Sequence, residues 1–240
     1  MPNAFIAKIR TYATLTSEDE ALLIAACVDN RRVPARRDLI REGDKPGPVH
    51  VMLEGWACRY KLLPDGGRQI VAFLIPGDFC DMHVAVLDHM DHSMATLTPA
   101  RVAMIPRQQM EVLIDSRPMI TQAFWRTQLV DEGVLRAWIV SMGRRDAAER
   151  VAHLMCELFL RLSVVGLTDG TSCALPLTQI VIADALGLTP VHVNRVLRSL
   201  REVGAMEIER GQLLINDTAR LAQIAGFDDN YLHRRMKRSV

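Results

Sequence analysis

The residues with the clearest capacity for chemistry are arginines that recur toward the C-terminal end of the chain. Arg195, Arg198 and Arg201 stand three positions apart, so on a helix they would lie along one side. A guanidinium group presents several N–H donors in one plane and can bind phosphate oxygens or the acceptor edge of guanine. This spacing indicates contact with a polyanion, provided that a helix holds the three side chains in solvent.

The surrounding segment, residues 177–203, has the pattern of two helices joined by a short turn. Thr178 can cap the first helix, and Gly187 permits a sharp turn after it. Thr189 is a good N-cap, and Pro190 suits the first position of a second helix. The positions of the second helix that we expect to be buried are Val193, Val196, Leu197 and Leu200. Two helices joined in this way form a helix-turn-helix unit, whose second helix enters the major groove of DNA with its N-terminus first.

The exposed positions of this unit have expected roles at double-stranded DNA. Thr189 and the free amides beside it can bind a phosphate, and Arg195 can donate two hydrogen bonds to guanine. Arg198 lies one turn further along and is expected to reach the DNA backbone. The segment MEIERGQLLI predicts a two-stranded wing that turns at Arg210 and Gly211. The residues expected to contact DNA are Thr178, Gln179, Thr189, Pro190, Val191, His192, Asn194, Arg195 and Arg198. A solvated helical hairpin with exposed arginines is the alternative interpretation.

Residues 117–143 are predicted to form one long helix with two apolar faces. Ser116 and Pro118 provide its start, and Gly143 provides its end. One stripe advances in steps of three and four residues, which is typical of a helix that pairs with another helix. Its members are Ile120, Ala123, Thr127, Val130, Val134 and Ala137. We assign this stripe to a homodimer interface, with a core helix inside a monomer as the alternative. The second stripe, expected to pack on the sheet, is Phe124, Leu135, Trp138 and Met142.

The first half of the chain is rich in short strands. From Val33 to Pro106 the stretches VHVMLEG, ACRYKLL, QIVAFLI and RVAMIP alternate with EGD, PDGG and PGD turns, which predicts an antiparallel sandwich or barrel. Helices are predicted for residues 16–28 and for RQQMEVLID. The chain is therefore expected to be α+β, with a β-rich domain in residues 1–116, the long helix in 117–143 and a winged helix-turn-helix domain in 144–240.

The stretch LPLTQIVIADALGLTPVHVNRVLRSLREVGAMEI resembles the DNA-binding domain of the Crp/Fnr superfamily of transcription regulators. The β-rich half, with its EGD, EG and PGDF turns, resembles the cyclic-nucleotide-binding-like β-roll of that family, so the resemblance covers about residues 15–225. It implies a homodimeric transcription factor for inverted-repeat operators, modulated by an effector or signal at the β-roll. An activator of this family would also contact RNA polymerase.

The resemblance also assigns roles to residues of the second helix. Arg195 matches the family's guanine-reading arginine, and Thr189 and His192 match positions that contact the DNA backbone. Pro190 and Val191 stand where the cyclic-AMP receptor subgroup has arginine and glutamate. Val191 is therefore expected to contact a thymine methyl group instead.

The residues after PGDF depart from the family's nucleotide-binding pattern. Cys80, Asp81 and Met82 stand where the ribose-binding glutamate would lie, and His92 lies near the position of the phosphate-binding arginine. No arginine occurs between Arg68 and Arg101, and burying a phosphate without a cation is costly. We therefore assign Cys80, Asp81, Met82 and His92 to an effector pocket, and we expect that cyclic AMP is not the effector.

Two further groups of residues leave open a haem-, metal- or redox-responsive sensor of the same fold. One is the polar cluster His83, Asp88, His89, Asp91 and His92, for which a solvated loop is the favoured interpretation. The other is the five cysteines, which include no CxxC pair and are expected to be buried thiols in a reducing compartment. We expect no resident metal or cofactor.

Composition and missing motifs exclude several other classes. Hydrophobic residues make up 49% and charged residues 24%, which is typical of a globular protein. The sequence contains neither a membrane-length apolar run nor a signal-peptide pattern, so we expect a cytoplasmic protein without a membrane partner. A cupin-like metal enzyme, the catalytic alternative, would need an HxH pair, which is missing along with GxSxG, Walker A and HExxH. We expect no catalytic residues.

Overall fold

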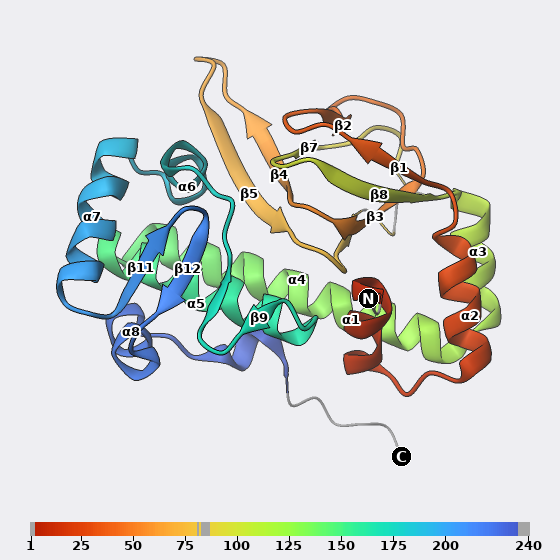
Figure 1. The fold of residues 1–240 in the computed structure, drawn as a ribbon. Helices are drawn as coiled ribbons and strands as arrows, with labels where there is room; N and C mark the ends of the chain where they lie inside the picture. The colour runs from red at the N-terminus through yellow and green to blue at the C-terminus, as the bar shows by residue number, and fades with distance from the viewer. Residues whose placement is uncertain (1–2, 81, 83–86, 235–240) are drawn as a thin grey trace. The chain divides into compact units, whose positions relative to one another are not determined.

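The computed structural model of the chain describes residues 3–80, 82 and 87–234 (Figure 1). Asp81 of the expected effector pocket and His83 of the polar cluster lie outside the described residues. The chain divides into two compact units. The first contains residues up to 61 together with 72–129, and the second contains residues 62–71 and 130–234.

Two short helices open the first unit. α2 (Ser17–Ala26) begins where the sequence predicts, because Thr16 and Asp19 each accept a hydrogen bond from the other's backbone amide and so form a capping box. α1 (Ala4–Tyr12) was not predicted. A charged residue interrupts its apolar stripe: Lys8 is buried, and its ammonium group lies 2.6 Å from the carboxylate of Asp78 in the PGDF turn.

The strands described in the β-rich half form two four-stranded sheets, ordered β1-β8-β3-β6 and β2-β7-β4-β5. The pairs β1–β8, β3–β8, β3–β6, β2–β7 and β4–β7 are antiparallel. The predicted strands are β3 (Val49–Glu54), β4 (Ala57–Leu62), β5 (Arg68–Leu74) and β8 (Ala100–Ile105). The others are β1 (Asn30–Val33), β2 (Asp38–Ile40), β6 (Phe79–Cys80) and β7 (Ser93–Thr96). These four have two to four residues each, which is too short for an alternating pattern to be evident.

Two helices follow the strands at the predicted places, α3 (Arg107–Ser116) and α4 (Pro118–Arg144). Figure 1 shows α4 as one continuous helix. It begins at Pro118, since a proline has no amide that needs a partner in the first turn. Ser116 does not act as the expected cap of α4, because its hydroxyl donates to the carbonyl of Val112 in α3.

The apolar stripe assigned above to the dimer interface is buried within the protomer. Five of its members, Ile120, Ala123, Thr127, Val130 and Val134, are at most 6% exposed, and Ala137 is half-buried. A side chain that is covered by its own chain cannot also meet a partner, so this assignment is wrong. The exposed apolar residues of α4 lie on its other side and are Trp125, Leu129, Leu135, Ile139 and Val140. Periodicity identifies the faces of a helix, whereas packing decides which face is covered.

The second unit contains the predicted helix-turn-helix and wing. α5 (Ala147–Val164) precedes α6 (Gln179–Leu186) and α7 (Pro190–Glu202), and the wing consists of β11 (Met206–Glu209) and β12 (Gln212–Ile215). The wing belongs to a four-stranded sheet, ordered β11-β12-β10-β9. The elements that were not predicted are β9 (Thr168–Asp169), β10 (Ser172–Ala174), α8 (Thr218–Ala225) and the 3-10 helix η2 (Asp229–Leu232).

Candidate nucleic-acid interface

The turn between α6 and α7 sets the direction of the second helix. The two helices are bent by 102° relative to each other, and Gly187 at the turn has a left-handed φ of 63°, which glycine adopts without steric cost. Thr178 caps α6 by accepting from the amide of Val181, and Thr189 caps α7 by accepting from the amide of His192 at 3.2 Å. With Pro190 at the first position, α7 begins abruptly at the surface.

The residues that the sequence assigns to DNA lie at the start of α6 and along α7. Those that are exposed are Thr178, Gln179, Thr189, Pro190, Val191, Asn194, Arg195 and Arg198, and His192 is half-buried. Val191 is 71% exposed and lies one turn before Arg195, so an apolar group and a guanidinium share one side of the helix. The opposite side is buried at Val193, Val196 and Leu200. The expected stripe is therefore present, with Leu197 only half-buried.

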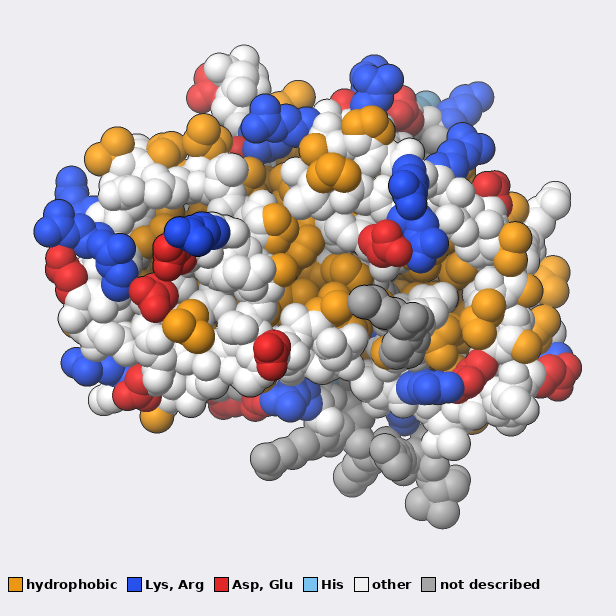
Figure 2. Space-filling view, viewed as in Figure 1, with side chains coloured by type: hydrophobic (Ala, Val, Ile, Leu, Met, Phe, Trp, Pro, Cys, Tyr) orange, Lys and Arg blue, Asp and Glu red, His pale blue; other side chains and the backbone are white. Residues whose placement is uncertain are grey.

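Charge along this face is mixed. Nε of Arg198 donates to a carboxylate oxygen of Glu202 at 2.8 Å, an exposed pair one turn apart on α7. Figure 2 shows Lys and Arg side chains over α7, with Asp and Glu side chains among them. Beside α7 lies a groove of about 230 Å³ whose lining residues are Gln179, Asn194, Leu197, Arg198, Arg201 and Ile208. Amide and guanidinium donors along a groove suit an anionic partner.

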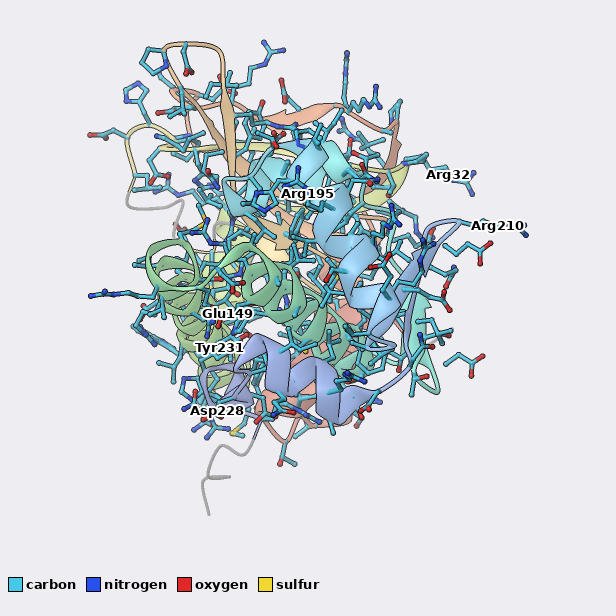
Figure 3. All side chains as sticks on the ribbon, turned by 90° about the vertical axis from the view of Figure 1, so that its left-hand side faces the viewer. Arg32, Glu149, Arg195, Arg210, Asp228 and Tyr231 are labelled. Atoms are coloured by element: carbon cyan, nitrogen blue, oxygen red, sulfur yellow. The ribbon has the colours of Figure 1, made fainter. Side chains whose placement is uncertain are left out.

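The wing adds a second cationic position. Glu209 pairs with Gln212, and the two residues between them have positive φ angles, 50° at Arg210 and 76° at Gly211. Two central residues of this kind form the tight turn that matches the twist of a hairpin. Figure 3 shows Arg195 on α7 and Arg210 at the tip of the wing. Both groups are exposed, as the prediction of a winged helix-turn-helix requires.

Arg150 holds the helices around this face, and sequence reasoning did not identify it. Its guanidinium donates to three main-chain carbonyls, those of Met142, Arg145 and Leu186, at 2.9, 2.9 and 3.2 Å. These carbonyls lie at the end of α4, before α5 and at the end of α6. Because helix ends leave carbonyls without intrahelical partners, one guanidinium satisfies groups from three segments and fixes the position of α6.

A buried polar cluster, also not predicted, ties η2 to α4 and α5. The carboxylate of Glu157 is fully buried and accepts from Trp138 at 3.1 Å, from the Tyr231 hydroxyl at 3.2 Å and from Arg161 at 3.2 Å. Burial raises the pKa of Glu157, and the positive charge of Arg161 opposes this. The Tyr231 ring stacks on His153, with centroids 5.7 Å apart. Burial, with a smaller effect of Arg145, lowers the pKa of His153 to about 4.

In the first unit the structure brings together two of the four residues assigned to the effector pocket. Sγ of Cys80 lies 3.8 Å from Nε2 of His92, while Met82 is buried. Arg59 of β4 was not predicted to belong to this site, because it lies before the PGDF turn and not in the segment that follows it. Its Nε donates to Sγ of Cys80 at 3.1 Å. The pairing of β4 with β7 explains why Arg59 lies near His92. Arg59 is opposite Met94, and His92 lies two residues before Met94, so the side chains of Arg59 and His92 are on the same face of the sheet.

Four residues of the polar cluster of the β-rich half lie in the described part of the chain: Asp88, His89, Asp91 and His92. Asp88 and His89 are exposed, which agrees with a solvated loop. Among the described residues, no group of three or more His, Cys, Asp or Glu side chains is placed to hold a metal ion. Over the same residues no single helix is long and apolar enough to cross a membrane, and the bent pair α6–α7 meets that test by length and composition only.

Comparison with known proteins covers both halves of the chain. A family described as a Crp-like helix-turn-helix domain matches residues 149–224, and one described as a cyclic nucleotide-binding domain matches residues 30–117. The nitrogen fixation regulation protein FixK of Bradyrhizobium diazoefficiens is 32% identical over 220 residues, which cover 90% of this chain and 91% of that protein. The transcriptional activatory protein AadR of Rhodopseudomonas palustris is 30% identical and covers 82% and 79%.

A solved structure agrees with this relationship at the level of the fold. The structure of FixK2 from Bradyrhizobium japonicum has a TM-score of 0.74 at 24% identity and covers 83% of this chain and 98% of that one. The two family matches fall on the β-roll and on the segment from α5 to α8. The chain therefore belongs to the Crp/Fnr family and is a DNA-binding transcription regulator with a cyclic-nucleotide-binding-like domain.

Proposed function

We propose that the protein works as a homodimer on inverted-repeat operators, with α4 as the dimerisation helix. The observation that carries this proposal is the uncovered apolar side of α4, where Trp125 is 63% and Ile139 is 72% exposed. Along this side Trp125, Leu129, Glu132, Arg136 and Ile139 follow in steps of four, three, four and three residues. That repeat is typical of two-stranded helix pairing.

Polar residues in the middle of the stripe support a defined register. Glu132 and Arg136 form an exposed ion pair of 3.4 Å within α4, and polar residues at such positions select one alignment of two helices. A two-fold dimer would present two copies of α7. Its half-sites would then be centred one helical turn apart, about 34 Å.

At each half-site we assign Arg195 to guanine and Val191 to a thymine methyl group. Thr189, His192 and Arg198 would contact phosphates, with Arg198 leaving its Glu202 partner to do so. The remaining residues proposed at the interface are Thr178, Gln179, Pro190 and Asn194.

We propose three functional parts of the chain: a β-roll domain in residues 1–116, the dimerisation helix in 117–143 and the DNA-binding domain in 144–240. We propose that a signal at the β-roll modulates DNA binding in the cytoplasm, and that the protein has no catalytic role. If it is an activator, it would also contact RNA polymerase. The names of its relatives, all transcription regulators or activators, support this assignment.

Sedimentation of substituted proteins tests the dimer. The wild type should sediment at twice the 26.9 kDa of one chain, whereas Trp125→Glu and Ile139→Glu should shift toward the monomer because each places a charge in the apolar stripe. Val112→Glu is the matched control, since Val112 is 64% exposed but lies on α3. A wild type of 26.9 kDa at micromolar concentration, or equal effects of all three substitutions, would refute the assignment of α4.

Selection from random double-stranded DNA tests the operator. The wild type should enrich inverted repeats with the spacing given above. Ile139→Glu should enrich single half-sites or nothing, because the two recognition helices would no longer be linked. Enrichment of single half-sites by the wild type would contradict the proposal.

A further inference from the structure

We propose that Cys80 is a peroxide-reactive thiol, and that Arg59, His92 and Asp91 assist its oxidation. The cluster lies between the two sheets of the β-roll. Cys80 belongs to β6, which pairs with β3, whereas Arg59 and His92 lie on or beside β4 and β7. The fold thus brings a sulfur nucleophile, a cation and an imidazole–carboxylate pair together from separate segments of the chain.

The geometry favours a reactive thiolate at this position. Nε of Arg59 donates to Sγ of Cys80 at 3.1 Å, and a second guanidinium nitrogen donates to the carbonyl of Phe79 at 3.4 Å, which holds the cation in place. Nε2 of His92 lies 3.8 Å from the sulfur, and its Nδ1 lies 2.7 Å from Oδ1 of Asp91. An adjacent cation and an oriented base are the two features that activate a cysteine.

Three of the other cysteines provide an internal comparison. Burial raises the pKa of Cys27 and Cys173 to about 11 and that of Cys156 to about 12. These thiols therefore stay protonated near neutral pH and are poor nucleophiles. Cys80 is equally buried but has a guanidinium and an imidazole beside its sulfur. If burial alone decided reactivity, these three and Cys80 would resist oxidation alike, as would Cys58, which is also buried.

The step that we propose is a two-electron oxidation by hydrogen peroxide or another small hydroperoxide. The thiol proton passes to Nε2 of His92, and the sulfur attacks one peroxide oxygen. The O–O bond breaks as the S–O bond forms, so the sulfur is oxidised to sulfenic acid and the peroxide is reduced. The leaving oxygen takes the proton from His92 and departs as water, or as the alcohol when the oxidant is an alkyl hydroperoxide. Asp91 orients the imidazole and stabilises its charged form. A small, uncharged oxidant suits a sulfur with no exposed surface.

Oxidation at Cys80 would be transmitted to α4 through its neighbour Phe79. The Phe79 ring packs against Phe124 of α4, with centroids 5.2 Å apart, and against Phe5 of α1, at 5.9 Å. An added oxygen in a fully buried site must displace its surroundings, because protein interiors are close-packed. The displaced strand β6 carries Phe79 with it. This consequence for DNA binding rests on the proposed role of α4, whereas the chemistry at Cys80 does not.

Mapping of sulfenic acid in the full-length protein tests the chemistry. The reduced protein is treated with one equivalent of hydrogen peroxide in the presence of dimedone, which traps sulfenic acid, and labelled peptides are quantified by mass spectrometry. Cys80 should be labelled first and at least about tenfold faster than Cys27, Cys156 or Cys173. Labelling of Cys80 no faster than these three would overturn the proposal, and this result requires no substituted protein.

Substitutions then assign the roles. His92→Asn and Arg59→Gln should each slow the labelling of Cys80 by about tenfold or more. His89→Asn is the matched control, because His89 is an exposed histidine three residues before His92 in the chain, and it should keep the wild-type rate. A wild-type rate in folded His92→Asn would refute the assisted mechanism. Circular dichroism verifies that each variant is folded.

Operator binding measured before and after peroxide treatment tests the consequence separately. The wild type should change its affinity, whereas Cys80→Ser should not. If dimedone labels Cys80 but affinity for DNA stays the same, the thiol chemistry stands and its proposed transmission through α4 fails.

Discussion

Gly133→Ala should destabilise the protein, although the same change in most helices is stabilising. Gly133 lies inside α4, where alanine normally favours the helix by about 1 kcal/mol over glycine. Here a Cβ atom would lie 2.4 Å from the carbonyl oxygen of Tyr231 in η2, with the carbonyl carbon at 3.3 Å. That contact is with backbone, so no side-chain rotation relieves it.

The expected magnitude follows from what holds η2 in place. To restore an ordinary contact of 3.4 Å, η2 must shift by about 1 Å. The shift would stretch the 3.2 Å hydrogen bond from the Tyr231 hydroxyl to the buried Glu157. Overpacking of this kind costs about 1–3 kcal/mol, and loss of a typical hydrogen bond adds about 0.5–1.5 kcal/mol. After the gain in helix propensity, a net loss of about 2 kcal/mol is expected.

Thermal unfolding measures this loss, with Gly143→Ala as the control in the same helix. No atom lies within 4 Å of a Cβ built at Gly143, so that variant should be as stable as the wild type or more stable by up to about 1 kcal/mol. For a chain of this size, 2 kcal/mol corresponds to a fall in Tm of about 4–8 °C. If Gly133→Ala matches or exceeds the Tm of Gly143→Ala, η2 does not pack on α4 as described and the reasoning fails.

Three further predictions concern pH, DNA and the effector. His153 has a pKa of about 4 in the folded state and about 6.5 when unfolded; the unfolded chain therefore binds more protons between these values, and stability should fall by about 3 kcal/mol as pH drops from 6.5 to 4. Urea unfolding should show a flatter pH dependence in His153→Asn, and an unchanged slope would mean that another group titrates. Arg195→Ala should lose about 1–3 kcal/mol of sequence discrimination, whereas Arg198→Ala should weaken binding to all sequences and flatten its salt dependence; identical specificity profiles in binding assays would disprove this division. Cyclic AMP should bind with a Kd above about 50 μM in titration calorimetry, because Arg59 already donates to Cys80 and Phe79, and tighter binding that also raises operator affinity would show that Arg59 can serve a nucleotide phosphate.

Local signals in the sequence determine the helix-turn-helix. Thr178, Gly187, Thr189 and Pro190 act within a few residues of their own positions, and the structure contains the caps, the left-handed glycine and the helix start that they predict. The Arg210–Gly211 turn is specified in the same way. Such features are evident in sequence because the partner groups are neighbours along the chain.

Features that join distant segments were decided by the tertiary structure alone. The apolar periodicity of α4 shows that the helix has more than one apolar face, but it does not show which face the protomer itself covers. Ile120 and Val134 were therefore predicted to meet the partner, whereas packing buries them inside their own chain. Arg59 meets Cys80 across 21 positions of sequence and Tyr231 meets Glu157 across 74, and in neither case does local spacing indicate a partner. Each contact depends on strand pairing or helix packing that brings separate segments together, so the cation beside Cys80 and the anchor of η2 became evident only in the folded chain.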